Sequence, residues 1–136
     1  MPYAVCYPEL ILNAPSTSKR RIVSIDDDLA FAQTLTKMLS SKGYGDTVSA
    51  DASYVFDLND DDVAFLDVLM PNTSGRQVMD QLAHQGRKCA IALMSGNSEQ
   101  LEQAEKYAAL LNLNLIGALD KPFRLADVEG VLEGIG

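Results

Sequence analysis

Four short apolar runs of this chain each end in side chains that can do chemistry, namely Asp26 and Asp27, then Asp67, then Ser95 and Gly96, then Lys121. Crowded carboxylates repel one another, so keeping them ionised together requires a cation. Oxygen ligands select a hard ion, with Mg²⁺ as the first candidate and Mn²⁺ as the second. Lys121 offers a point charge for a phosphoryl group, Ser95 offers a hydroxyl donor, and Gly96 permits close backbone approach. A carboxylate in this setting can attack phosphorus and form an aspartyl phosphate.

Apolar periodicity predicts the elements that position these side chains. From Arg21 onward, strand-like apolar runs alternate with stretches whose apolar residues recur at helical spacing. The predicted strands are 22–25, 47–50, 63–66, 89–94 and 115–119, and the predicted helical stripes are 31–39, 54–58, 74–86, 101–111 and 125–135. This alternation predicts an α/β fold, a doubly wound, five-stranded parallel sheet with helices on both faces.

Position relative to the strands separates two runs of three aspartates. In a parallel sheet, ligands bind beyond the carboxyl ends of the strands. Residues 26–28 follow their strand and so belong to that edge, where Asp28 is expected to cap the helix that begins at Leu29. Residues 60–62 precede their strand, so we expect them at the opposite edge with a loop and solubility role.

The acidic composition excludes several classes of partner. The 136 residues carry 19 acidic and 11 basic side chains, for a formal net charge of −8, which argues against non-specific nucleic-acid binding and against an anionic membrane surface. Cys6 and Cys89 lie far apart without metal-like spacing. We therefore expect free thiols in a cytoplasmic protein, with one disulfide in a secreted domain as the alternative. His84 has no ligand-type neighbour at metal-binding spacing, so we expect an exposed, structural residue.

Four segments resemble the signatures of a known family. VSIDDD, FLDVLMPNTSG, IALMSG and LDKPF are similar to the four signature segments of response-regulator receiver domains from two-component signalling. The resemblance covers residues 20–136 in order and with matching spacing, and it implies a flavodoxin-like (βα)5 fold. We expect a receiver domain at 19–136 after an N-terminal extension, 1–18, which holds three of the five prolines and is expected to be flexible.

The resemblance implies a role for each strand-end residue. It makes Asp67 the phosphoacceptor, and it makes Asp26 and Asp27 the acidic pair that holds Mg²⁺, with Asp27 favoured as the direct ligand. The backbone carbonyl of Leu69 would be a further ligand of the ion. The other matched positions are Ser95 and Gly96 for phosphoryl binding and switching, Lys121 as the family's lysine, Pro71 and Gly75 in the loop after the phosphoacceptor, and Pro122, which follows a cis peptide bond in the family.

One position departs from the family pattern. Receivers usually carry an aromatic residue three positions before the lysine, and its ring turns inward when the serine or threonine moves toward the phosphate. Here that position is Ala118. We therefore expect that output does not take its common form through the fourth helix, fifth strand and fifth helix. The run LIGALDKPFRLADVEGVL also resembles, more loosely, receivers attached to cyclic-di-GMP phosphodiesterase domains.

The resemblance implies a phosphorylation-dependent signalling switch instead of a metabolic enzyme. A histidine kinase or phosphotransfer protein would phosphorylate Asp67, and the altered surface would act on a partner, an output domain or a second copy. The chain would catalyse only its own phosphoryl transfer and slow autodephosphorylation. One alternative is an interaction domain of receiver fold that works without phosphorylation. The other is a Mg²⁺-dependent phosphatase of haloacid-dehalogenase type, which needs a second aspartate where this chain has Leu69.

Overall fold

Strands and helices alternate along the chain in the computed structural model, which describes residues 21–42, 44, 47–70 and 74–133. The predicted extension at 1–18 and Pro71 lie outside the described residues. The elements are β1 (Ile22–Ile25), α2 (Leu29–Ser41), β2 (Thr47–Ala50), the 3-10 helix η2 (Ala52–Asp57), β3 (Val63–Asp67), α3 (Gly75–Gln85), β4 (Ala90–Ser95), α4 (Ser98–Leu110), β5 (Asn114–Asp120) and α5 (Leu125–Glu133).

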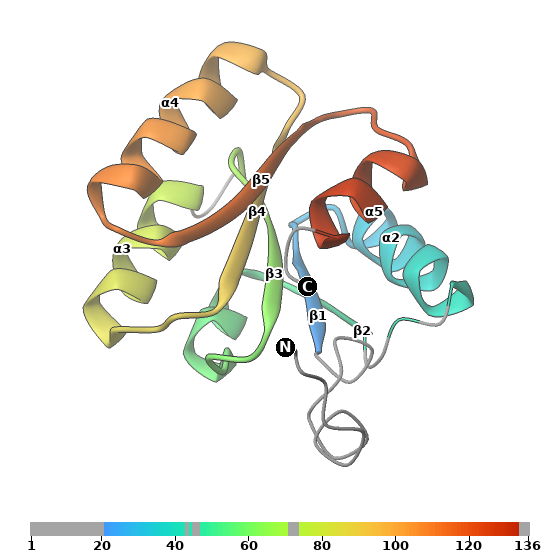
Figure 1. The fold of residues 1–136 in the computed structure, drawn as a ribbon, viewed down its shortest axis with the longest axis horizontal. Coiled ribbons are helices and arrows are strands. Elements are labelled where there is room, and N and C mark those ends of the chain that lie inside the picture. Colours follow the sequence, from blue (N-terminus) through green and yellow to red (C-terminus); the bar gives the residue numbers. More distant parts are fainter. Residues whose placement is uncertain (1–20, 43, 45–46, 71–73, 134–136) are drawn as a thin grey trace, which may run out of the picture.

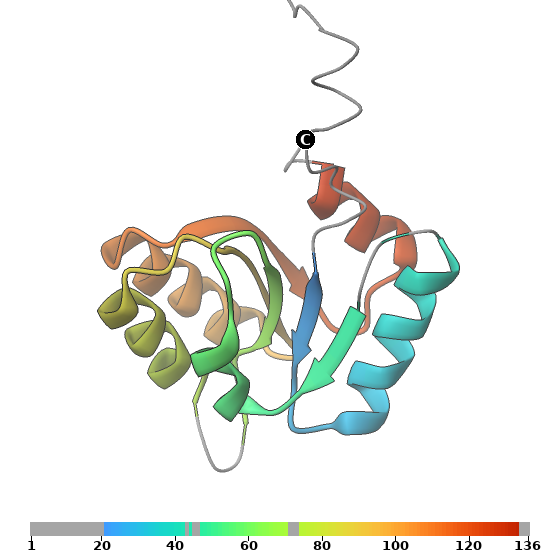
Figure 2. The same cartoon turned by 90° about the horizontal axis from the view of Figure 1, so that it is seen from below.

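The five strands form one parallel sheet in the order β2-β1-β3-β4-β5. The chain runs outward from β1 to β2 and then crosses back to β3, so the strand order reverses between β1 and β3. Helices α2 and α5 cover one face of the sheet, and α3 and α4 cover the other (Figures 1 and 2). The predicted flavodoxin-like α/β fold is confirmed, and its reversal point identifies the edge at which ligands bind such sheets.

The connection between β2 and β3 differs from the prediction. A helical stripe was expected at 54–58, whereas the structure has a six-residue 3-10 helix, η2, that begins earlier. The Asp51 carboxylate starts it by accepting a hydrogen bond of 3.0 Å from the Ser53 N–H. Val55 and Leu58 are buried on the face of the sheet that α3 covers. A 3-10 helix is a short element, and η2 with the residue that follows it is enough to bury these two apolar residues, so the helix expected at 54–58 is a 3-10 helix at Ala52–Asp57 instead.

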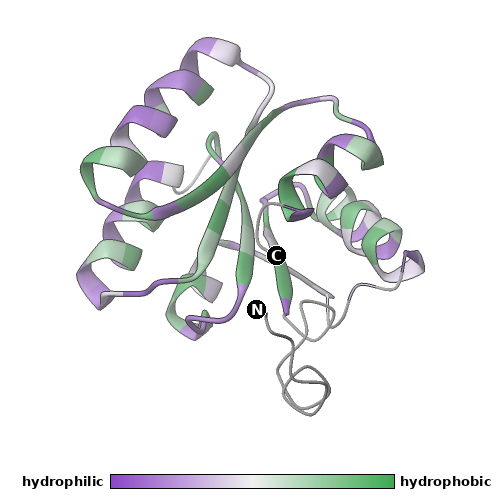
Figure 3. Ribbon diagram, in the orientation of Figure 1, coloured by the Kyte–Doolittle hydropathy of each residue, from purple (hydrophilic) through white to green (hydrophobic). Residues whose placement is uncertain are grey.

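The strands bury both of their faces, which explains why they are almost continuously apolar. On β1, Val23 and Ile25 join the core beneath α3 and α4, while Ile22 joins the core beneath α2 and α5. Figure 3 shows the central strands in the hydrophobic colour and the helices striped with hydrophobic and hydrophilic residues. The polar edge of the sheet is therefore set apart from an apolar middle.

Helix ends follow the local sequence signals. The Asp28 carboxylate caps α2 by accepting from the Phe31 N–H at 3.1 Å, as predicted. Ser74 and Gln77 form a reciprocal capping box at the start of α3, and Gly86 ends that helix with a left-handed φ of 68°. His84 is exposed near this end. Across the described parts of the chain, every helix falls short of the length and apolarity needed to cross a bilayer.

Two of the three aspartates at 60–62, before β3, accept hydrogen bonds that were not predicted. They lie at the amino end of that strand, as expected, but Asp62 is buried. Its two carboxylate oxygens accept from the Arg21 guanidinium at 3.1 and 2.6 Å, and one also accepts from the Asn59 N–H at 2.7 Å. Asp60 accepts from the Lys88 N–H at 3.0 Å, whereas Asp61 is exposed. The solubility role is thus wrong for Asp60 and Asp62, because the fold brings distant donors to them.

Replacing Asp62 by alanine should destabilise the fold. Asp62→Ala leaves the Arg21 guanidinium without its carboxylate and the Asn59 N–H without its acceptor, so we expect a loss of about 2 to 4 kcal/mol in the free energy of unfolding. Urea denaturation measures this loss, and Asp61→Ala is the matched control because its side chain is exposed. Equal stability of the two variants would contradict a structural role for Asp62.

Candidate functional site

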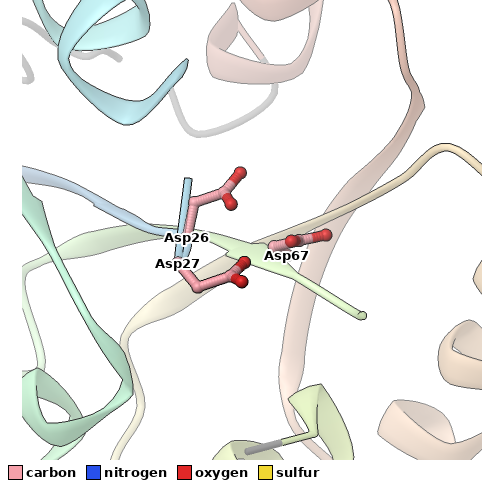
Figure 4. Close-up of side chains that lie close together, drawn as sticks. All are labelled: Asp26, Asp27 and Asp67. Carbon is pink, nitrogen blue, oxygen red and sulfur yellow. The ribbon is translucent and has the colours of Figure 1, made fainter. Parts of the chain in front are cut away.

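Three carboxylates converge where the strand order reverses. β1 and β3 pair in parallel with Ile25 opposite Leu66, so the next residues along both strands, Asp26 and Asp67, emerge side by side. Asp27 follows on the same loop, and one oxygen from each of the three carboxylates lies within 4.8 Å of the others. Figure 4 shows the three side chains turned toward the same space. Two separate segments therefore build one acidic cluster.

Lys121, which directly follows the carboxyl end of β5, completes the cluster. Its ammonium donates to Asp26 Oδ2 at 2.7 Å and lies 3.7 Å from Asp67 Oδ1. The other Asp26 oxygen accepts from the Asp28 N–H at 2.9 Å. Asp26 is fully buried, and these two donors satisfy its charge. Asp27, by contrast, is exposed, so solvent and ions reach its carboxylate directly.

Burial makes Asp67 a weak acid. The pKa of its carboxyl is raised from 3.8 to about 6, first by loss of hydration and then by the neighbouring charge of Asp26, while Lys121 and the Leu69 N–H act in the opposite direction. The Leu69 N–H lies 3.4 Å from Asp67 Oδ1. One ammonium therefore does not compensate the carboxylates completely. A divalent cation would relieve the remaining repulsion, and a set of three carboxylates fits the preference of Mg²⁺ for oxygen ligands.

Ser95 and Gly96 follow β4 beside the acidic cluster. Asp67 pairs with Met94 across the sheet, so Ser95 is the next residue beyond that pair. Ser95 is buried, its hydroxyl oxygen accepts from the Asn97 N–H at 3.0 Å, and its carbonyl accepts from the Lys121 N–H at 2.8 Å. A Cβ placed on Gly96 would meet no atom within 4 Å. This open space next to a buried hydroxyl leaves room for a bound group.

The loops around the cluster hold it in place. A Cβ on Gly75 would lie 2.9 Å from the Val68 Cα, so glycine is needed where α3 begins against the loop that follows Asp67. The Gly75 N–H donates to the Val68 carbonyl at 3.0 Å. The peptide bond between Lys121 and Pro122 is cis. Leu69 is 50% exposed on this loop.

Sequence reasoning missed one residue of this site. Phe31 was assigned only to an apolar helical stripe, yet its ring lies 4.2 Å from the Lys121 ammonium. The available signal was its place three residues after the capping Asp28, which holds the first turn of α2 next to the acidic loop. Ala118, where an aromatic ring was expected by family resemblance, is half-buried against the core on the side of α3 and α4.

Comparison with known proteins identifies the family. The family described as "Response regulator receiver domain" matches residues 22–133, which include every described element. The chain belongs to this family. Response regulator MprA of Mycobacterium sp. (strain KMS) is 32% identical over 111 residues, and that alignment covers 79% of this chain and 46% of the relative. MprA of Mycolicibacterium vanbaalenii is 31% identical over the same length. The receiver domain thus spans about half the length of these curated relatives.

Solved structures show the same architecture. A response regulator from Colwellia psychrerythraea superposes with a TM-score of 0.75 at 26% identity, covering 85% of this chain and 95% of that one. The structure titled CheX-CheY-BeF3-Mg+2 complex from Borrelia burgdorferi superposes with a TM-score of 0.71 at 18% identity, covering 85% and 88% of the two chains. Receiver domains are signalling components of two-component systems and not conventional metabolic enzymes.

The raised pKa of Asp67 predicts a specific pH dependence of stability. Between pH 4 and 6 the folded receiver domain retains a proton on Asp67 that the unfolded chain has already lost, so this residue lowers stability as the pH rises through that window. Relative to Asp67→Asn, the metal-free wild type should therefore lose up to about 3 kcal/mol between pH 4 and pH 7. Urea denaturation in the presence of a chelator measures the difference, and a difference that does not vary with pH would contradict the assignment.

Proposed function

We propose that this receiver domain is a phosphorylation-dependent signalling switch, with Asp67 as the phosphoacceptor in a Mg²⁺-dependent reaction. The observation that carries the proposal is the cluster itself, in which the Lys121 ammonium lies 2.7 Å from Asp26 and 3.7 Å from Asp67. The donor would be a histidine kinase or phosphotransfer protein. The outcome would be a changed surface that acts on a partner, an output domain or a second copy.

The proposed chemistry assigns one task to each group. An Asp67 oxygen attacks the phosphorus of the donor's phosphohistidine, an O–P bond forms, the N–P bond breaks, and the histidine nitrogen takes up a proton. Because its pKa is about 6, Asp67 is largely ionised at neutral pH and able to attack. Lys121 places positive charge beside the phosphoryl oxygens, and Ser95 with Gly96 contributes a hydroxyl and open backbone on the other side.

A bound Mg²⁺ would neutralise the carboxylates and draw negative charge from the transferring phosphoryl group. Its ligands would be Asp26, Asp27, Asp67 and the carbonyl of Leu69, with Asp27 as the most accessible of the carboxylates. The haloacid-dehalogenase alternative needs a second acid at position 69. Leu69 supplies no titratable side chain there, so that reaction is not proposed.

We place the receiver domain at 19–136 and the extension at 1–18, in a cytoplasmic protein. Cys89 fits a reducing compartment because it is a free, buried thiol, and burial raises its pKa to about 11, so the thiol stays protonated. Ala118 provides no ring to follow a movement of Ser95, so the proposed output does not use that ring.

Labelling with a small phosphodonor tests the proposed reaction. Incubation of the protein with Mg²⁺ and acetyl phosphate should give an adduct of one phosphoryl group, about 80 Da by intact mass, that is stable in acid and labile in base. The matched control is Asp67→Asn, which keeps the shape of the side chain and removes the nucleophile. Absence of the adduct on the wild type, or equal labelling of the variant, would instead favour an interaction domain that works without phosphorylation.

Mg²⁺ affinity tests the proposed ligands separately. Asp27→Ala should weaken Mg²⁺ binding at least about tenfold, because it removes an exposed carboxylate from the cluster. Asp61→Ala should leave the affinity unchanged, because that exposed carboxylate lies at the other edge of the sheet. Isothermal titration with MgCl₂ measures both. Equal affinities would show that the ion does not bind at the strand ends.

A further inference from the structure

The lysine of this site lies against an aromatic ring. The Lys121 Nζ is 4.2 Å from the centroid of the Phe31 ring, in addition to its contacts with Asp26 and Asp67. We propose that Phe31 is a positioning residue for phosphoryl transfer, holding the Lys121 ammonium at the strand ends by a cation–π contact. This inference rests on the proposed function, because it assigns to Phe31 a role in the same reaction.

The three neighbours of the ammonium differ in kind. Asp26 forms a full ion pair at 2.7 Å, whereas Asp67 at 3.7 Å lies beyond ordinary hydrogen-bond distance. The ring attracts the cation through the negative face of its π system but carries no net charge. It therefore helps to fix the position of the ammonium without adding a negative charge to those of Asp26 and Asp67, and it keeps the ammonium beside the place where a phosphoryl group on Asp67 would lie.

Phe31 is held by one backbone contact and one ring contact. The Phe31 N–H donates to the Asp28 carboxylate at 3.1 Å, which fixes the first turn of α2 directly after the acidic pair. The Phe123 ring meets the Phe31 ring edge to face, with centroids 5.6 Å apart and planes at 90°. Both rings pack against the core beneath α2 and α5. The loop that presents Asp26 and the segment that presents Lys121 are thus joined through two aromatic side chains.

Loss of the ring should affect the reaction more than the fold. A lysine side chain has four rotatable bonds, so without the ring its ammonium would occupy the position beside Asp67 for a smaller fraction of the time. Phe31→Leu keeps an apolar side chain of similar bulk but removes the cation–π contact. Phe31→Tyr keeps the aromatic ring and should retain the cation–π contact with Lys121.

Phosphorylation kinetics with acetyl phosphate and saturating Mg²⁺ provide the main test. We expect Phe31→Leu to lower the maximal rate of Asp67 labelling about three- to tenfold, with a change of less than about twofold in Mg²⁺ affinity. Phe31→Tyr should retain most of the rate. Tyr44→Leu is the matched control, because Tyr44 is a half-buried aromatic residue packed against the same core beyond the other end of α2.

A double substitution and a spectroscopic signal distinguish positioning from general damage. In a Lys121→Ala background, Phe31→Leu should cause no further slowing, because its effect acts through the missing ammonium. In the metal-free wild type, the Lys121 ε-methylene protons should show an upfield ring-current shift by NMR that Phe31→Leu abolishes and Tyr44→Leu preserves.

The outcomes separate the two proposals. Labelling of the wild type with an unchanged rate in Phe31→Leu would overturn the role of Phe31 and leave the proposed function in place. Equal slowing by Phe31→Leu with and without Lys121, or by Tyr44→Leu, would also overturn it. No labelling of the wild type would overturn the proposed function and, with it, the role of Phe31 in transfer.

Discussion

The described structure depends on placing two buried carboxylates and one ammonium together at one edge of an apolar sheet. Asp26 is fully buried, Asp67 is 6% exposed, and Lys121 is the ammonium that reaches both. Burial of one charge alone would be costly, so the two carboxylates, which repel each other, depend on the Lys121 ammonium that lies beside both. The incomplete compensation of Asp67 is what makes the edge receptive to a further cation.

The apolar sheet creates this constraint and also determines its location. Both faces of the strands are covered by helices, so a charged residue can leave the core only at a strand end. The amino ends of the strands show the same rule, because Asp62 is buried there and pairs with Arg21. The two edges differ in one respect. Arg21 satisfies Asp62 with a bidentate contact, whereas one ammonium is shared between Asp26 and Asp67. The edge at the amino ends of the strands is therefore structural, whereas the edge at their carboxyl ends retains negative charge that no nearby cation among the described residues neutralises.

Membership of the receiver family places this chain in two-component signalling. The curated relatives are about twice as long as the segment they share with this chain. Within the shared segment, Ala118 leaves β5 without the ring that a receiver usually has. The Phe31 ring lies against the lysine and meets the Phe123 ring, so these aromatic residues connect the lysine to α2 and to the segment before α5. The lysine of the site is thus linked to the face of the sheet that those two helices cover.

Much of this picture was readable from the sequence because it depends on local patterns. The apolar runs predicted the strands, Asp28, Ser74 and Gly86 marked helix ends, and the order of strands and helices placed the charged residues at one edge. The roles of individual charges were not readable in the same way. Asp60 and Asp62 looked like solubility residues, and Phe31 looked like an ordinary core residue, because their partners are distant in sequence. Only the tertiary structure brings Arg21 to Asp62 and Lys121 to Phe31, since ion pairing, desolvation and cation–π contact depend on distances that the chain reaches only after it folds.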